Sequence, residues 1–259
     1  GQIAFLLTRG RQAREALDSI ENLFEVDDER QKGSMSLPVT PSGYRIKLEK
    51  LSFNYPDISV PALADLDLEI NPGERIAVIG RVASGKSTLG RQFRPTDLRS
   101  TFRYVGQDAN LFTGSIRYNI GLGKPGASDS EILNALAVSG ADKFLARDES
   151  GFDREVGEQG RRLSGGQRAF LALSRAFVAP CDLLFLDEPT GAMDSHTEKQ
   201  MVERLRSALS ENQTLVVSTH RPALFALCNR IIVMDQGRIV ADGSKEEILS
   251  QRGQQSELG

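Results

Sequence analysis

The stretch that decides the fold is Gly80-Arg81-Val82-Ala83-Ser84-Gly85-Lys86-Ser87, together with the apolar run Arg75–Ile79 directly before it. This run is short and rich in β-branched residues, so it predicts a buried strand of a parallel sheet. A glycine-rich turn between such a strand and a helix points backbone N–H groups at one spot, and the helix N-terminus adds positive potential there. We therefore predict a phosphate-binding loop in an α/β fold, with a helix that starts near Lys86.

Within this loop, Lys86 is expected to reach the β- and γ-phosphates of a nucleotide, and the Ser87 hydroxyl to ligate Mg²⁺. Ala83 stands where such loops usually have glycine, and its methyl group is tolerated only if the local φ is negative. The alternative is a chance match in an ordinary glycine-containing turn. The other loop residues expected to contact the nucleotide are Gly80, Ser84, Gly85 and Thr88.

A second apolar strand, predicted over Asp182–Leu186, is followed directly by Asp187 and Glu188. Ligands of open α/β sheets bind beyond the carboxyl ends of the strands. Asp187 is therefore placed to hold Mg²⁺, directly or through water. Glu188, one residue on, points elsewhere and could polarise an attacking water. The alternative is that the two acids mark only a helix start, near the positive end of the helix dipole.

Between these two elements lies Leu163-Ser164-Gly165-Gly166-Gln167. With this motif, the chain from about Tyr44 to Ser250 resembles the nucleotide-binding domain of the ATP-binding cassette (ABC) superfamily. Its serine and glycines make a second amide-rich anion site. The resemblance implies that this site caps the γ-phosphate of an ATP held by a second copy in a head-to-tail homodimer. The residues that would contact nucleotide in this way are Ser164, Gly165, Gly166 and Gln167.

Three single positions also match the family. Tyr55 corresponds to the aromatic that stacks on adenine, and Gln107 to the glutamine that contacts Mg²⁺ and senses the membrane partner. His220, after the predicted strand Thr214–Ser218, corresponds to the switch histidine that touches the γ-phosphate. Alone, Tyr55 would more often be a strand aromatic and His220 a capping or core histidine. Their order relative to the stronger motifs favours the functional interpretation.

The resemblance implies a P-loop NTPase cassette in which a mostly parallel core sheet carries the site. An antiparallel β portion is expected near residues 44–74 and a helical subdomain near 115–178, within a cassette over 44–259. A helical repeat of apolar residues predicts a helix at the start of the chain. We interpret residues 1–25 as the cytosolic end of a last transmembrane helix and 26–43 as a linker. The alternative is an amphipathic helix that packs on its own domain.

Composition limits the other classes of function. The 259 residues carry a net charge of −3 and a pI of about 5.6, so no global basic field favours nucleic acid as a partner. Cys181 and Cys228 lack metal-ligand spacing and are typical of reduced, buried cysteines in a cytosolic compartment. No run of eighteen apolar residues occurs.

Two segments resemble exporters rather than importers. Arg154–Gly160 matches the exporter X-loop, which contacts the transmembrane domain, and Leu111–Ile116 matches the exporter segment after the glutamine. Gly237–Gly243 and Thr190–Asp194 most resemble type I secretion exporters. The expected function is thus a Mg²⁺-dependent ATPase that powers type I protein secretion at the cytoplasmic face of the inner membrane. A periplasmic adaptor and an outer-membrane channel would then be further partners.

Two other functions stay open at this point. A lipid, peptide or drug exporter would use every ATP-contacting residue named above. A non-transport ABC ATPase acting on DNA or the ribosome would need a coiled-coil insertion, a zinc module, a basic face or a tandem cassette, and the sequence has none of them.

One departure from the family concerns length. Gln107 follows Lys86 by only 21 positions, whereas exporters have a longer segment that supplies an antiparallel hairpin. Either a segment is missing from this sequence or the hairpin is deleted. Because loss of a hairpin exposes a sheet edge and core, we favour a missing segment.

Overall fold

A computed structural model describes residues 43–56, 58–92, 101–146 and 148–256. The predicted terminal helix and linker lie outside the described residues, as does the stretch 93–100 where the short connection was noted. Within the described part, no helix is both long and apolar enough to cross a bilayer.

The core is a six-stranded sheet in the order β4-β5-β6-β3-β7-β8. All neighbours run parallel except β7 and β8, which are antiparallel. The strands predicted before the phosphate loop, before the two acids and before the histidine are all present, which confirms the predicted α/β cassette fold. The bounds are β3 (Arg75–Gly80), β4 (Phe102–Val105), β5 (Leu183–Asp187), β6 (Thr214–Ser218), β7 (Arg230–Asp235) and β8 (Arg238–Ser244).

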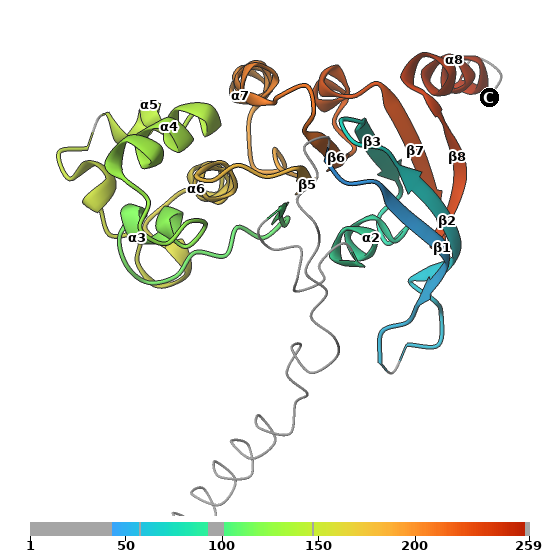
Figure 1. The fold of residues 1–259 in the computed structure, drawn as a ribbon, viewed down its shortest axis with the longest axis horizontal. Helices are drawn as coiled ribbons and strands as arrows, with labels where there is room; N and C mark the ends of the chain where they lie inside the picture. Colours follow the sequence, from blue (N-terminus) through green and yellow to red (C-terminus); the bar gives the residue numbers. More distant parts are fainter. Residues whose placement is uncertain (1–42, 57, 93–100, 147, 257–259) are drawn as a thin grey trace, which may run out of the picture. The chain divides into compact units, whose positions relative to one another are not determined.

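One face of this sheet packs against helix α2 (Lys86–Gln92) and a small antiparallel sheet of β1 (Ile46–Phe53) and β2 (Leu63–Ile70) (Figure 1). Gly90 of α2 has a packing reason. A Cβ at this position would lie 2.5 Å from Cε1 of Phe185 on β5. The glycine therefore lets the helix after the phosphate loop sit directly on the sheet.

The opposite face of the sheet packs against α6, α7, the 3₁₀ segment η5 and α8. A separate apolar cluster joins α3, α4 and α5 to the other side of α6, and these helices lie together at one side of the sheet (Figure 1). The helices are α3 (Ile116–Gly121), α4 (Asp129–Ser139), α5 (Asp142–Leu145), α6 (Gly165–Phe177), α7 (Ser195–Ala208) and α8 (Lys245–Ser256), and the 3₁₀ segments are η3 (Gly151–Asp153), η4 (Glu158–Gly160) and η5 (Pro222–Leu227).

Two helices begin with the same motif. Ser128 caps α4 and Ser164 caps α6, each as half of a capping box with the residue three positions on. In each box the serine hydroxyl accepts from a backbone N–H while the partner side chain accepts from the serine N–H. The motif Leu163–Gln167, called the signature motif below, therefore begins a locally stable helix.

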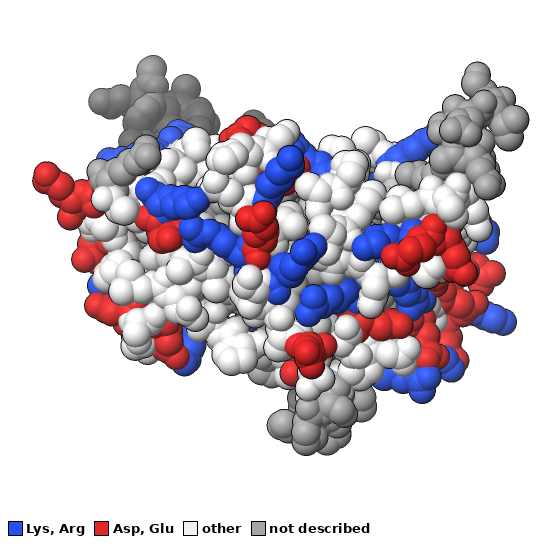
Figure 2. Space-filling model, turned by 90° about the horizontal axis from the view of Figure 1, so that it is seen from above, with Lys and Arg blue, Asp and Glu red and all other residues white. Residues whose placement is uncertain are grey.

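The cysteines and the surface charges agree with the composition, with one correction. Cys228 is buried, but Cys181 is only partly buried rather than fully so. Burial raises the pKa of both thiols, to about 12 for Cys228, so both stay protonated near neutral pH. On the face seen in Figure 2, basic and acidic side chains lie side by side rather than in separate fields.

Candidate functional site

A cavity of about 810 Å³ lies at the carboxyl ends of β3, β5 and β6. Because neighbouring parallel strands end at the same edge of a sheet, loops far apart in the sequence meet there. The phosphate loop, the two acids, the histidine and the segment after β4 all contribute to its wall. The predicted site residues that line it are Ala83, Lys86, Ser87, Gln107, Gly165, Asp187, Glu188 and His220.

Lys86 is held inside the loop that it belongs to. Its Nζ donates to the carbonyl oxygens of Gly80 and Arg81, each at 2.8 Å, and lies 3.4 Å from Ser84 Oγ. Burial lowers the pKa of this amine, and the carboxylates of Glu188 and Asp187 oppose that shift. The ammonium is thus surrounded by oxygen atoms that phosphate oxygens could replace.

Asp187 supplies the observation that tests whether a divalent cation fits. The residue is 1% exposed, and its Oδ2 accepts a hydrogen bond of 3.0 Å from the Tyr104 hydroxyl. Its Oδ1 is buried and has no partner among the described residues, and the same holds for Ser218 Oγ. An unpartnered buried carboxylate oxygen is costly, and a hard cation would satisfy it.

The other candidate ligands are consistent with Mg²⁺. Ser87 and Gln107 line the same cavity as Asp187 and offer a hydroxyl and an amide oxygen. The described residues contain no group of three His, Cys, Asp or Glu that could hold a metal alone. Mg²⁺ suits such a site, because it is commonly bound by one or two carboxylates with phosphate oxygens and waters.

Glu188 and His220 form a pair at the edge of the cavity. Glu188 Oε1 lies 2.9 Å from His220 Nδ1, and Thr219 Oγ1 lies 3.5 Å from Glu188 Oε2. The His220 side chain is 70% exposed and that of Glu188 13%. Glu188 has a left-handed backbone with φ 48°. A carboxylate oriented by an imidazole and open to the cavity can act as a general base.

The phosphate loop contains one conformation that the sequence analysis got wrong. Ala83 has φ 63°, in the left-handed region, and not the negative φ that its methyl group was expected to require. This conformation costs a non-glycine residue about 1–2 kcal/mol. The turn geometry of the whole loop outweighs the preference of this single residue.

Replacing Ala83 by glycine is therefore expected to stabilise the domain. Relief of the left-handed strain exceeds the extra entropy of the unfolded glycine chain by about 0.5 kcal/mol, which raises Tm by about 1–2 °C. Ala137→Gly, in the exposed interior of α4, is the control and should destabilise by about 0.5–1 kcal/mol. Thermal unfolding followed by circular dichroism measures the stability of both variants. A lower Tm for Ala83→Gly would show that the left-handed backbone of Ala83 is not strained.

Most of the signature motif lines a cavity other than that of Lys86. Ser164, Gly166 and Gln167 line a second cavity of about 370 Å³ together with Asp194, and Gly165 lines both cavities. The Ser164 hydroxyl accepts from the Gln167 N–H at 3.2 Å, within its own helix. Within one chain, the motif therefore does not come together with the phosphate loop as a whole.

Tyr55 also lies away from the residues that line the cavity. Its ring meets Phe53 edge-on at 5.0 Å, its hydroxyl lies 3.2 Å from Thr88 Oγ1, and it accepts from Arg91 at 3.2 Å. It thus contacts the helix that follows the phosphate loop. The remaining predicted nucleotide contacts, which lie in that loop and the first turn of α2 and do not line the cavity, are Gly80, Ser84, Gly85 and Thr88.

Several residues around the site were missed by the sequence analysis. Tyr104 donates to Asp187 and Arg91 donates to Tyr55. Arg221 donates to the carbonyl oxygens of Gly191 at 3.3 Å and Met193 at 3.1 Å. No local motif marks these residues, because their partners come from other strands and loops. Only the adjacency of Arg221 to His220 could have suggested a role.

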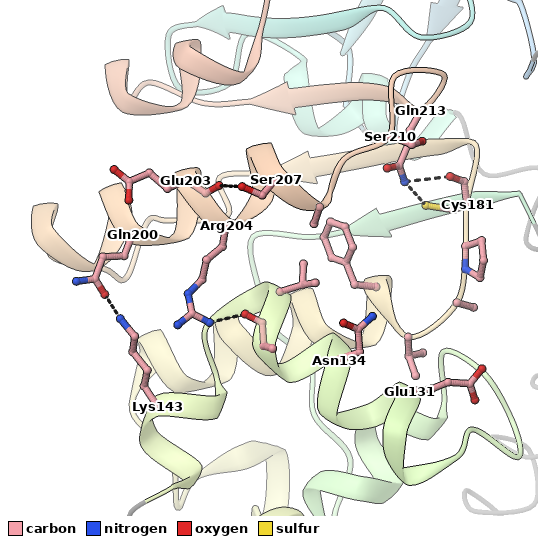
Figure 3. Close-up of a pocket in the computed structure, with 17 residues that line it drawn as sticks. Glu131, Asn134, Lys143, Cys181, Gln200, Glu203, Arg204, Ser207, Ser210 and Gln213 are labelled. Atoms are coloured by element: carbon pink, nitrogen blue, oxygen red, sulfur yellow. Dashed lines mark hydrogen bonds between the residues drawn. The ribbon is translucent and has the colours of Figure 1, made fainter.

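A larger cavity, of about 1080 Å³, lies between α4, the end of α6 and α7 (Figure 3). Its labelled polar side chains are largely engaged with neighbours, as with Gln213 and Cys181 or Lys143 and Gln200. Arg204 donates to Asp142 at 2.8 Å. None of the predicted site residues lines this cavity, so size alone does not identify the functional site here.

The chain is similar to proteins of known family. The family model described as ABC transporter matches residues 90–191. An ATP-dependent lipid A-core flippase of Chromobacterium violaceum is 34% identical over 259 residues, covering 92% of this chain and 44% of that protein. A Staphylococcus aureus protein named for multidrug export as an ATP-binding/permease protein is 32% identical over 252 residues, covering 89% of this chain and 43% of that protein.

A solved structure agrees with the sequence matches. A bacterial Atm1-family ABC exporter with ATP bound superposes with a TM-score of 0.83 at 30% identity, over 95% of this chain and 46% of that one. The chain spans less than half the length of each of these relatives. Fold, motifs and relatives agree: the chain has the α/β fold of an ABC cassette, and it is similar to the ATPase domains of ABC transporters.

Proposed function

We propose that this domain hydrolyses Mg²⁺-bound ATP in the cavity at the ends of β3, β5 and β6. The observation that carries the proposal is that Lys86, the unpartnered Oδ1 of Asp187 and the Glu188–His220 pair all belong to this one cavity wall. Asp187, Ser87 and Gln107 would hold Mg²⁺. When bound, the ion would neutralise charge on the phosphate oxygens.

The chemistry assigned to the side chains is that of a general base with an orienting partner. Glu188 accepts the proton of a water whose oxygen attacks the γ-phosphorus, and the bond to the oxygen bridging the β- and γ-phosphates breaks to give ADP and phosphate. His220 holds the Glu188 carboxylate at Oε1 and contacts the γ-phosphate. Lys86 exchanges loop carbonyls for phosphate oxygens, which balance its charge.

We further propose that the site is completed by a second copy of the chain. Ser164, Gly166 and Gln167 of one copy would cap the ATP bound to the phosphate loop of the other, and Tyr55 would stack on adenine. Support comes from the capping residues, which line a different cavity from Lys86 within one chain. Assembly by two copies would bring the two halves together.

The domain is proposed to drive a fused transmembrane permease at the cytoplasmic face of a membrane, with residues 1–43 as the connection. The named relatives are lipid A-core flippases and a multidrug export protein. An amphipathic lipid or drug is therefore a better-supported cargo than a secreted polypeptide. Type I secretion stays a prediction that rests on Gly237–Gly243 and Thr190–Asp194.

Deletion of the gene tests the cargo. We expect altered lipid or drug export and an unchanged set of secreted proteins, because the similar proteins are named for lipid A-core flipping and multidrug export. Comparative lipid analysis and drug-efflux assays measure lipid and drug export. Mass spectrometry of the culture medium measures the secreted proteins. Loss of one large secreted protein, with lipid and drug export unchanged, would instead support type I secretion.

A further inference from the structure

We propose that Tyr104 is a positioning residue that orients the Asp187 carboxylate for a divalent cation. This inference rests on the proposed function, in which Asp187 holds Mg²⁺. It adds a residue outside the predicted motifs to the machinery of the site.

The position of Tyr104 follows from the sheet. On β4 it pairs with Phe185 of the neighbouring β5, so its side chain reaches along β5 to the residue at the end of that strand. The two rings stack with centroids 5.5 Å apart and an interplanar angle of 25°, and Phe185 is fully buried. The stacked ring places the hydroxyl, which donates to Asp187 Oδ2 at 3.0 Å.

The direction of this hydrogen bond is determined by the groups around it. An ionised carboxylate can only accept, so the proton of this bond comes from the Tyr104 hydroxyl. The charge of Arg91 also acts on this hydroxyl.

The consequence for Asp187 is a defined orientation. The terminal torsion of an aspartate is broad, so a carboxylate without a partner samples many angles. With Oδ2 held by Tyr104, Oδ1 is the oxygen that has no partner among the described residues. A ligand held in the binding orientation loses less freedom when the cation arrives, and removal of such an orienting partner typically weakens metal binding about 10- to 100-fold.

The same contacts reach the helix after the phosphate loop. Arg91 donates to the Tyr55 hydroxyl at 3.2 Å, and this hydroxyl lies 3.2 Å from Thr88 Oγ1. Tyr104 thus lies in a network that links Asp187 on β5 to α2. Arg91 is exposed, so this network can be altered from the surface without a change in the core.

The test compares Tyr104→Phe with the wild-type 259-residue chain, with ADP as the probe so that neither hydrolysis nor an ATP-dependent dimer intervenes. Calorimetry gives the dissociation constant of ADP in MgCl₂ and in EDTA. The EDTA value divided by the MgCl₂ value isolates the contribution of the metal. Phenylalanine keeps the ring stack and removes only the hydroxyl. We expect this ratio to fall about tenfold, with the EDTA value unchanged.

Three further variants make the outcome decisive. Tyr118→Phe, at an exposed tyrosine of α3, is the matched control and should change neither value. Arg91→Met should lower the ratio about threefold from the surface, which tests the network even if Tyr104→Phe fails to fold. Asp187→Asn should remove the Mg²⁺ effect.

If Asp187→Asn does so and Tyr104→Phe and Arg91→Met do not change the ratio, Tyr104 has no positioning role. If the wild-type chain shows no Mg²⁺ effect, the metal site itself is wrong.

Discussion

Replacing Glu188 by glutamine is expected to lower ATP turnover about a hundredfold or more while ATP binding stays intact. Glutamine keeps the shape of the side chain and can still hydrogen-bond His220 Nδ1, which lies 2.9 Å from Glu188 Oε1. It lacks the basic carboxylate that accepts the proton of the attacking water. Lys86 and Asp187, which would hold the phosphates and the cation, are untouched by this change.

Steady-state phosphate release and calorimetric ATP binding measure the two halves of this prediction. Glu203→Gln, at an exposed position of α7 outside the site, is the matched control and should retain wild-type turnover. If Glu188→Gln turns over within a few-fold of wild type, the base lies elsewhere. If it no longer binds ATP, Glu188 is needed for ATP binding, and the variant does not measure its role in proton transfer.

Introducing arginine at Ser164 is expected to abolish ATP-dependent dimer formation in the Glu188→Gln chain. Without nucleotide the chain should be mainly monomeric, and ATP should join two copies across the signature motif. An arginine there adds bulk and charge at the proposed interface. It also removes the hydroxyl that caps α6, a loss that costs about 1 kcal/mol.

Because of this second effect, the control must lose a cap as well. Ser128→Arg removes the equivalent capping box of α4, at a position that is also exposed and lies outside the signature. It should leave the ATP-dependent dimer intact. Sedimentation velocity with and without ATP distinguishes the variants. A dimer that persists in Ser164→Arg, or monomers throughout in the parent chain, would count against assembly by two copies.

The elements that could be read from the sequence are those whose signals are local. An apolar strand before it and a helix after it mark the phosphate loop in the sequence. Strand β6 covers Thr214–Ser218, the range predicted for it. The two acids at the end of β5 both line the cavity, Asp187 as the last residue of the strand and Glu188 directly after it. In each case a few consecutive residues carry the information.

The elements that could not be read depend on partners distant in the sequence. The left-handed φ of Ala83 follows from the closure of the whole loop, and no propensity of alanine predicts it. The contacts of the Tyr55 hydroxyl with Thr88 and Arg91 were likewise not predicted, and its stacking on adenine stays a prediction. These outcomes reflect packing between elements, which outweighs the preferences of single residues.

By itself, the sequence determined the α/β cassette fold and the likeness to ABC ATPases, because the spacing of motifs around apolar strands is a local and repeated signal. Only the tertiary structure decided which groups meet. It brought Tyr104 of β4 to Asp187 of β5 and paired Glu188 with His220. It also left most of the signature motif in a cavity apart from Lys86. The physical reason is that strand order in a parallel sheet is set by packing of helices on both faces, which joins residues that no sequence window contains.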